Sequence, residues 1–330
     1  MKKDEKNEVV ELEQGGGGQK SAELIGAIRG IISDKGKWKN QMDDGATLKV
    51  GNQHLVFTTD AYIVDPLFFP GGDIGKIAVC GTINDLAMMG AVPQGLSLSM
   101  VIEEGFPKKD LLQISSSIQK MSHEAGVPIV TGDTKVMPKG KIDKIEITTA
   151  GVGLAKKIIS NGGIKIGDVI ISSGDLGEHT VALLSSRFNY KTNLKSDSKT
   201  LHREIKEVGN FLHSAKDPTR GGLSANLIEM AEKSKVKIVL EEELLPYKKE
   251  TFALANLLGL DVFSFASEGR FVGAVAEKDA QKVLKILKKF NKEAKIIGWA
   301  ERGSGLHLKT ELGSLRRIEM PRGKLVPRIC

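Results

Sequence analysis

The last position of the sequence is a cysteine, Cys330, which follows a segment that contains Pro321 and Pro327. Two prolines and no helical period predict an extended, mobile segment whose thiol has no place in a core. The ten residues from Pro321 to Cys330 span up to about 33 Å when fully extended. We therefore interpret Cys330 as a reactive group that could be carried into a distant pocket. The alternative is a frayed end without a function.

Acidic residues recur at four places in the first half of the sequence, most of them where a predicted strand gives way to a loop. They are Asp43 with Asp44, Asp60 after Thr59, Asp85 after Asn84, and Asp133 after Thr131 and Gly132. Carboxylates without histidine are typical Mg²⁺ ligands, usually together with substrate phosphates. The four places together therefore predict a nucleotide site with Mg²⁺, although each alone is also typical of an ordinary turn.

Glycine-rich segments add to this prediction. Four consecutive glycines, Gly15, Gly16, Gly17 and Gly18, allow backbone N–H groups to approach phosphates closely. Arg220, followed by two glycines ahead of a predicted helix, is suited to binding an anion, and a plain helix cap is the alternative. Glu268 precedes a glycine and an apolar strand, a pattern that alone indicates only a turn. The sequence has neither a P-loop motif nor a dinucleotide-binding glycine motif after a strand.

Composition limits the class of protein. With 330 residues, 40% hydrophobic and 27% charged, the chain has enough material for two domains with cores. It has no apolar run of membrane-spanning length and begins with charged residues unlike a signal peptide, so we expect a cytoplasmic protein without a membrane partner. The cysteines Cys80 and Cys330 are too few for a disulfide framework. The net charge of +7 comes from scattered lysines, which argues against nucleic-acid binding.

The apolar pattern predicts two α/β units. The expected helices cover 21–32, 73–89, 108–125, 177–188, 201–213, 221–234, 248–258 and 278–290, and the expected strands cover 47–50, 54–58, 96–101, 129–131, 145–154, 169–172, 237–240 and 271–275. A Gly-rich connector near residue 160 separates the units. We therefore divide the chain into 1–38, a flexible Gly-rich segment and helix; 39–158, an ATP-binding and dimerisation domain; 159–312, a second α/β domain; and 313–330, a mobile tail.

A combination of motifs resembles the HypE family of [NiFe]-hydrogenase maturation factors. The motifs are FTTDA around Asp60, VDPLFFPGGDIGKIAVCGTINDLAMMGA (64–91), EEGFP (103–107), TGDTKV (131–136), DPTRGG (217–222), SEGR (267–270) and PRIC (327–330). The similarity runs from Gly15 to Cys330. The wider superfamily contains aminoimidazole ribonucleotide synthetase, thiamine-phosphate kinase and selenophosphate synthetase.

The resemblance implies a fold and an activity. The fold is the two-domain fold of aminoimidazole ribonucleotide synthetase, of mixed α/β class, in which the first sheet joins that of a partner in a homodimer. The activity is ATP-dependent dehydration of a carbamoyl group on Cys330 to a thiocyanate, which supplies cyanide for the hydrogenase iron. The implied partners are a HypF-type carbamoyltransferase that loads Cys330 and an iron-carrying acceptor complex of the HypC/HypD type.

The resemblance also implies roles for individual residues. Lys135 and Glu268 match the pair that handles protons at the carbamoyl group of Cys330. Mg²⁺ is expected at Asp43, Asp44, Asp60, Asp85 and Asp133, and ATP at Gly15, Gly16, Gly17, Gly18, Thr59, Asp60, Asn84, Asp85, Thr131, Gly132 and Arg220.

One residue departs from the family pattern, since Gln14 stands where a histidine usually precedes the glycines. The segment 191–199 is also unusually polar and rich in lysine. Two alternatives to the dehydratase stay open: a small-molecule kinase or synthetase of the same superfamily, in which Cys330 is incidental, and a noncatalytic carrier of a group on Cys330.

Overall fold

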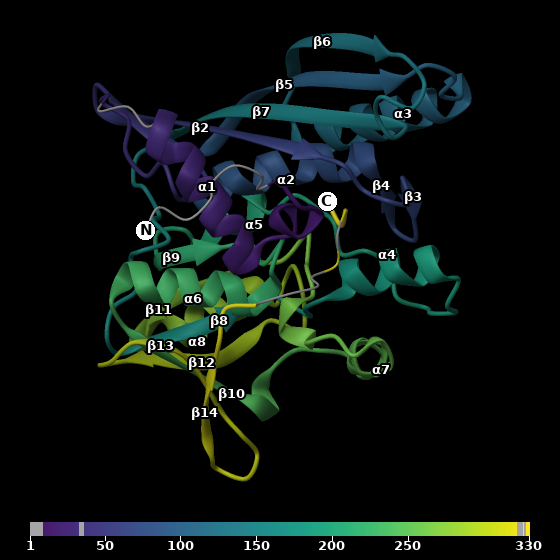
Figure 1. The fold of residues 1–330 in the computed structure, drawn as a ribbon. Coiled ribbons are helices and arrows are strands. Elements are labelled where there is room, and N and C mark those ends of the chain that lie inside the picture. The colour runs from purple at the N-terminus through teal and green to yellow at the C-terminus, as the bar shows by residue number, and fades with distance from the viewer. Residues whose placement is uncertain (1–8, 33–35, 322–325, 327) are drawn as a thin grey trace, which may run out of the picture.

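The computed structural model describes residues 9–32, 36–321, 326 and 328–330, which form two α/β domains in chain order (Figure 1). Residues 1–8 of the charged start and five of the ten residues of the predicted extended segment 321–330 lie outside these residues. Within them, no helix is long and apolar enough to cross a membrane.

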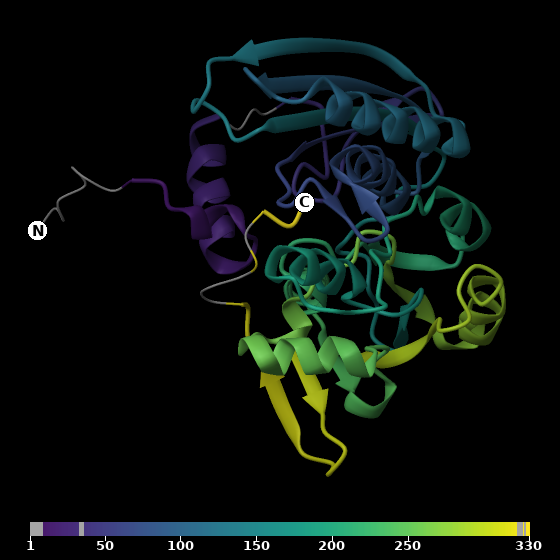
Figure 2. The same cartoon turned by 90° about the vertical axis from the view of Figure 1, so that its right-hand side faces the viewer.

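The first domain is a five-stranded sheet with the order β1-β2-β7-β5-β6. Its strands are β1 (Ala46–Val50), β2 (Gln53–Tyr62), β5 (Val92–Glu103), β6 (Ile129–Met137) and β7 (Ile145–Ala155), with a small hairpin of β3 (Phe68–Phe69) and β4 (Gly72–Asp73) beside it. The helices α2 (Ile74–Met88) and α3 (Lys108–Ala125) cover one face. Nearly every residue of α2 is buried, because the helix packs between this sheet and the second domain. As Figure 2 shows, no helix among the described residues covers the outer face of the sheet.

The second domain is a seven-stranded sheet with the order β14-β13-β10-β12-β8-β11-β9. Its strands are β8 (Asp168–Ser172), β9 (Leu212–Lys216), β10 (Lys237–Glu241), β11 (Val272–Ala276), β12 (Lys295–Glu301), β13 (Gly305–Lys309) and β14 (Leu315–Ile318). Its helices are α4 (Glu178–Phe188), α5 (His202–Val208), α6 (Gly222–Ser234), α7 (Lys249–Leu258) and α8 (Glu277–Leu287). Two apolar clusters of buried side chains pack against this sheet.

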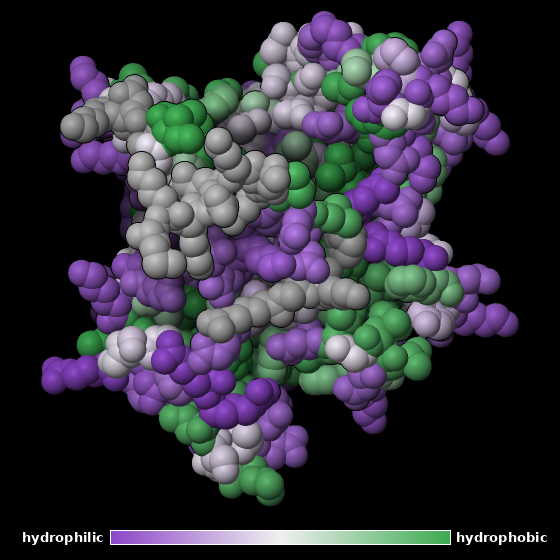
Figure 3. Space-filling model, in the orientation of Figure 1, coloured by the Kyte–Doolittle hydropathy of each residue, from purple (hydrophilic) through white to green (hydrophobic). Residues whose placement is uncertain are grey.

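Two segments far apart in the sequence meet beside the boundary between the domains. Helix α1 (Gly18–Ile32) runs along the side of the molecule, and in both ribbon views the last residues of the chain lie between the domains (Figures 1 and 2). Hydrophilic residues gather in the middle of this face (Figure 3). The arrangement therefore brings the tail to the boundary where the polar side chains of both domains meet.

The predicted α/β pattern is confirmed, with differences at particular elements. The helix expected over 201–213 is wrong in its last part: α5 ends at Val208, and 212–216 form β9. Gly209 closes the helix, and the following residues gain a ladder of hydrogen bonds with β11. Strands β12, β13 and β14 were not predicted, because distant strands stabilise them. Strand β14 also lies within 313–330, so the start of the expected tail belongs to the second sheet.

Candidate functional site

A polar cavity of about 480 Å³ lies between the two domains. The first domain supplies strand β2 and helix α2, the second supplies the segment that joins β9 to α6, and α1 closes one side. The lining residues predicted from sequence are Gly17, Gly18, Asp43, Asp44, Thr59, Asp60, Asp85 and Arg220. Residues from five separate parts of the sequence therefore meet in one cavity.

Three carboxylates converge at the centre of this cavity. Asp44, Asp85 and Asp217 each offer an oxygen, and these oxygens lie within 4.8 Å of one another. Burial, together with repulsion from Asp60, Asp217 and Asp44, raises the pKa of Asp85 well above its usual range, although Thr58 Oγ1 donates to it at 2.8 Å. Burial and the Asp44 charge raise the pKa of Asp217 to about 8. The cluster therefore carries more negative charge than its own surroundings stabilise.

Lysines of the second domain anchor the loop that carries Asp43 and Asp44. Lys216 Nζ donates to Asp44 Oδ1 at 2.7 Å, and Lys233 Nζ donates to Asp43 Oδ1 at 2.9 Å. Burial alone would raise the pKa of Asp43, but the bonds from Lys233 outweigh it and lower that pKa. The side chain of Asn161 also donates to Asp44 Oδ1 at 3.3 Å. The acidic loop of the first domain is thus fixed by ion pairs that cross the domain boundary.

The carboxylate cluster fits a divalent cation such as Mg²⁺. Asp44 Oδ2 is fully buried and has no hydrogen-bond partner among the described residues. Neighbouring carboxylates raise the pKa of Asp85 and of Asp217, an effect that a cation between them would reverse. The set is made only of oxygen donors, and a cavity beside it leaves room for phosphates and water. Asp217 belongs to this set although the sequence indicated only the arginine and glycines that follow it.

The glycine-rich segment contacts the loop that contains Arg220. Gly17 has a φ of +89°, and a Cβ atom on it would lie 3.1 Å from the carbonyl carbon of Arg220. Any larger residue would therefore be both strained and crowded at this position. Gln14, which stands where the family has a histidine, accepts a hydrogen bond from Glu11 N, and its carbonyl accepts one from Ser21. Gly15, by contrast, has open space around it and does not line the cavity.

The tail is held between the domains mainly through its backbone. Ile63 N donates to Cys330 O at 3.3 Å and Asp65 N donates to Arg328 O at 3.2 Å, so the tail pairs in antiparallel fashion with the segment after β2. His179 and Arg187, both on α4, donate to the carbonyls of Ile329 and Arg328 at 2.7 and 3.0 Å. The Ile329 side chain is buried in the apolar core of the first domain. These contacts form the seat of the tail.

The seat brings the Cys330 thiol to the acidic cavity. Burial and the charge of Glu268 raise the pKa of Cys330, while Arg220 opposes that shift. Conversely, Cys330 is the largest cause of the raised pKa of Arg220. The thiol therefore lies within electrostatic reach of residues that line the cavity.

Glu268 is buried beside the thiol in a rigid setting. Its backbone N donates to Asp197 Oδ1 at 2.9 Å and its carbonyl accepts from Asn84 Nδ2 at 3.2 Å. Burial and the Asp217 charge raise the pKa of Glu268 well above its usual range, and its Oε1 atom has no partner among the described residues. A Cβ atom at Gly269 would lie 2.0 Å from Asp197 O, so only glycine fits after Glu268. Asp197, which comes from the polar segment 191–199, thus positions the catalytic candidate.

Besides Gly15, Gly16 and Glu268, five residues predicted to bind ATP or Mg²⁺ or to transfer protons do not line this cavity. Thr131, Gly132, Asp133 and Lys135 are on the exposed edge strand β6, where Lys135 Nζ donates to Asp133 Oδ2 at 2.7 Å. Asn84 is fully buried, and its amide bonds to Lys199 O, Glu268 O and Leu201 N, so it links the domains. Within one chain, therefore, β6 contributes no residue to the carboxylate cluster. The roles predicted for the four residues of β6 and for Asn84 stay predictions.

Several residues of the site had no distinctive sequence pattern. They are Asp217, Lys216, Lys233, Asn161, His179 and Arg187. The pair Lys216-Asp217 at the end of β9 could have been found from its place before Arg220. The two residues on α4 could not, because an isolated histidine or arginine on a buried helix is usually structural.

The sequence matches two family models. The AIR synthase related protein N-terminal domain matches residues 42–155, and the AIR synthase related protein C-terminal domain matches 165–311. The chain is 41% identical to carbamoyl dehydratase HypE of Rhizobium leguminosarum bv. viciae, over 100% of this chain and 97% of that protein. It is 37% identical to carbamoyl dehydratase HypE of Escherichia coli, over 97% and 99% of the two chains.

Solved structures agree with these matches. A crystal structure of a HypE-HypF complex is similar with a TM-score of 0.85 at 36% identity, over 91% of this chain and 100% of that chain. The crystal structure of hydrogenase maturation protein HypE in complex with ATP gives 0.81 at 34%, over 98% and 100% of the chains. A ThiL complex gives 0.74 at 18% identity, a similarity of fold alone. From its two domains, its cavity and these relatives, this chain belongs to the HypE family of carbamoyl dehydratases.

Proposed function

We propose that this protein dehydrates a carbamoyl group carried on Cys330 to a thiocyanate, with ATP as the second substrate, during [NiFe]-hydrogenase maturation. One observation carries the proposal: the Cys330 thiol lies within electrostatic reach of Glu268 and of Arg220, Asp60 and Asp217, which line the cavity that contains the carboxylate cluster. The name carbamoyl dehydratase among full-length relatives and the ATP complex of a similar structure support the same reading.

The chemistry removes one oxygen and two protons from the carbamoyl group. The amide oxygen attacks the γ-phosphorus of ATP and ADP leaves, while one N–H proton is lost. The C–O bond then breaks, phosphate departs with the oxygen, and loss of the second N–H proton completes the C≡N bond. Phosphorylation is needed because an amide oxygen is otherwise a poor leaving group. The products are a cysteine thiocyanate, ADP and phosphate.

The residues near Cys330 suit two requirements of this reaction: a base that accepts an N–H proton, and positive charge near the oxygen that is phosphorylated. Glu268, with its raised pKa and unpartnered Oε1, is a stronger base than an exposed carboxylate and is the candidate for accepting an N–H proton. Arg220 supplies positive charge beside the oxygen that is phosphorylated. Asp44, Asp85 and Asp217 would hold Mg²⁺, which would neutralise charge on the triphosphate.

The proposal includes a homodimer formed through the first sheet. Its outer face has no helix, and Phe57, Val130 and Val136 are exposed there or on the neighbouring edge strand β6. Asp133 and Lys135 lie on that same strand, outside the cavity of their own chain. A second copy placed against this surface would give these two residues a site to act on, which supports their predicted roles in Mg²⁺ binding and proton transfer.

Two further partners belong to the proposal. The carbamoyl donor would be a HypF-type carbamoyltransferase, in line with the HypE-HypF complex of similar fold. The cyanide acceptor would be an iron-carrying complex of the HypC/HypD type, because a thiocyanate on Cys330 has to transfer its cyano group to iron.

The test is the intact mass of the protein after incubation with ATP, Mg²⁺, carbamoyl phosphate and the carbamoyltransferase. A gain of about 25 Da, the mass of a cyano group replacing the thiol hydrogen, is expected for the wild type and not for Cys330→Ala. A carrier without catalytic activity would stop at about 43 Da, the mass of the carbamoyl adduct. ATP turnover without either adduct would instead favour a small-molecule kinase or synthetase.

A further inference from the structure

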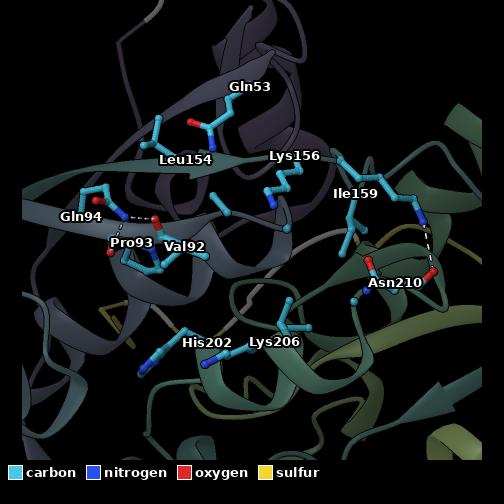
Figure 4. A pocket seen from close by; sticks show the side chains of 15 residues that line it. Gln53, Val92, Pro93, Gln94, Leu154, Lys156, Ile159, His202, Lys206 and Asn210 are labelled. Atoms are coloured by element: carbon cyan, nitrogen blue, oxygen red, sulfur yellow. Dashed lines mark hydrogen bonds between the residues drawn. The ribbon is translucent and has the colours of Figure 1, made fainter. Parts of the chain in front are cut away.

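A second cavity, of about 400 Å³, lies where the start of β5 and the end of β7 meet helix α5 of the second domain (Figure 4). Val92, Pro93 and Gln94 form one wall, Ile159 and Asn210 form the opposite wall, and Lys156 reaches in from the end of β7. The cavity that contains the carboxylate cluster of Asp44, Asp85 and Asp217 is called the nucleotide cavity from here on. It shares no lining residue with the second cavity. The two cavities are therefore separate sites.

The charged groups that line this second cavity are all cationic. Lys156, Lys157 and Lys206 contribute ammonium groups, and no aspartate or glutamate is among the lining residues. Lys157 Nζ is already bonded to the carbonyls of Asn210 and Leu212, at 3.4 and 3.3 Å. Lys156 and Lys206 make no hydrogen bond or ion pair with any described residue. Two ammonium groups are thus available to an anion at the mouth of one concave surface.

Apolar and amide groups form the rest of the lining. Val92 is 60% exposed here, beside the side chains of Pro93, Leu154 and Ile159. Gln53 and Asn210 add amides that can donate to oxygen atoms, whereas Gln94 Nε2 already donates to the carbonyls of Val92 and Pro93. An apolar wall combined with a few polar groups, at a boundary between domains, is typical of a small-molecule site.

His202 is a further polar residue in the lining of this cavity. Its Nδ1 atom is fully buried and has no hydrogen-bond partner among the described residues, and the residue lines the cavity. Burial lowers the pKa of His202, so the ring is neutral near pH 7 and adds no charge to the cavity.

An ordinary solvated surface explains these features less well. Exposed lysines on helices usually lie among carboxylates, as Lys120 does beside Glu124 on α3. Here the lysines surround a concave apolar surface that lacks negative charge. A volume of about 400 Å³ also falls within the range of about 300–1,000 Å³ that is common for small-molecule sites.

We propose that this cavity binds a small organic anion: a carboxylate or phosphate group between Lys156 and Lys206, carried on a flat apolar body that lies against Val92, Pro93 and Ile159. The site is distinct from the nucleotide cavity and does not depend on the proposed dehydratase activity. A free carboxylate metabolite and a phosphorylated one share this chemistry, and the probes below distinguish them.

The experiment measures binding of phenyl phosphate and of benzoate to the full-length protein by calorimetry and ligand-detected NMR, with ATP and Mg²⁺ saturating so that the nucleotide cavity is filled. Inorganic phosphate and phenol test whether both parts of the probe are needed. We expect saturable binding of one aromatic anion, at least tenfold weaker binding of the two fragments, and at least tenfold weaker binding by Lys156→Gln/Lys206→Gln.

The matched control is Lys278→Gln/Lys285→Gln, which removes the same charge from the exposed face of α8. Its affinity for the probe should equal that of the wild type. Val92→Asp, which places a negative charge on the cavity wall, is a second variant that should also weaken binding. The proposal is overturned if the wild type shows no saturation below about 10 mM, or if the two double variants bind the probe equally.

Discussion

His179 and Ile329 are joined by a hydrogen bond of 2.7 Å between the ring Nε2 and the backbone carbonyl. Because a carbonyl only accepts, Nε2 carries the proton, and Nδ1 therefore accepts from Ser196 Oγ at 2.8 Å. Burial lowers the pKa of His179, so the neutral ring with this one tautomer is the stable form. A fully buried histidine of α4 thus fixes the position of the residue next to Cys330.

Removing this hydrogen bond should release the tail. His179→Phe keeps a ring of similar size but cannot donate, so the docked tail should lose about 1.4 kcal/mol, a factor of ten. We expect a thiol reagent to label Cys330 about ten times faster in this variant, with ATP affinity unchanged. Labelling reports Cys330 alone, because Cys80 is fully buried and burial raises its pKa to about 12.

The conservative variant His179→Gln serves as the control for tail release. Its amide retains a donor, so part of the wild-type protection of Cys330 should return. Equal labelling rates for the wild type and His179→Phe would show that this hydrogen bond does not determine the position of the tail.

Asp217 should make stability depend on pH. Its pKa is about 8 in the folded protein, so between its ordinary value and pH 8 the folded state binds more protons than the unfolded state. The free energy of unfolding without Mg²⁺ should therefore fall as the pH rises towards 8. Urea unfolding at several pH values measures this slope, and Asp217→Asn should flatten it.

Mg²⁺ binding gives the complementary measurement. A cation at the cluster displaces the proton of Asp217, so binding at pH 7 should release protons and binding at pH 9 should release fewer. Calorimetry in two buffers of different ionisation enthalpy detects the difference. Proton release that is the same at both pH values would contradict the raised pKa.

Asp85→Asn should separate stability from activity. Asparagine resembles the protonated aspartate that the raised pKa favours, and it can still accept the hydrogen bond from Thr58. We expect an unfolding temperature equal to or above that of the wild type without Mg²⁺, and ATP turnover reduced by at least about a hundredfold. Wild-type turnover at saturating Mg²⁺ would remove Asp85 from the metal site.

Mixed dimers test whether β6 acts on a second copy. If Asp133 and Lys135 serve the partner's cavity, Asp133→Asn/Lys135→Ala should be inactive alone and regain activity when mixed with Glu268→Gln. Random exchange places half of the chains in mixed dimers with one intact site each, so about a quarter of wild-type activity is expected. Intact mass should show the thiocyanate only on chains that carry the β6 substitutions.

The control mixture combines Glu268→Gln with Asp85→Asn. Both substitutions lie in the same cavity, so no intact site can form and no activity should return. Activity in this control, or none in the test mixture, would argue against a site shared between copies.

Sequence reasoning predicted several of the residues that the fold gathers in one cavity, because strand ends collect polar residues. Asp44, Asp60 and Asp85 were predicted from their places next to strands or within the family motif, and all line one cavity. Asp217 was missed because its role depends on the carboxylates that lie next to it, and these belong to the other domain. Similarly, nothing in the sequence around His179 indicated that the opposite end of the chain would dock against it.

The helices and strands were likewise predicted where the local sequence determines them, and missed where distant residues do. Helix α3, with its amphipathic pattern and Gly126 in the left-handed conformation at its end, was predicted to the residue. Strands β12 to β14 were missed, and residues 212 and 213 of β9 were taken for the end of a helix, because pairing with β8, β10 and β11 determines their conformation. Local preference alone does not contain that information.

Among the described residues of the tail, the last three are held by hydrogen bonds to their carbonyls and by the buried Ile329 side chain. In kinetic terms the chain is an enzyme whose substrate peptide is covalently attached, so each molecule reacts once and then waits to be unloaded. A truncated protein that lacks the last residues should bind a free peptide ending in Arg-Ile-Cys as its substrate. Such a truncated protein would be a true catalyst with multiple turnovers, and its Michaelis constant would measure how much the tether raises the local concentration of the peptide.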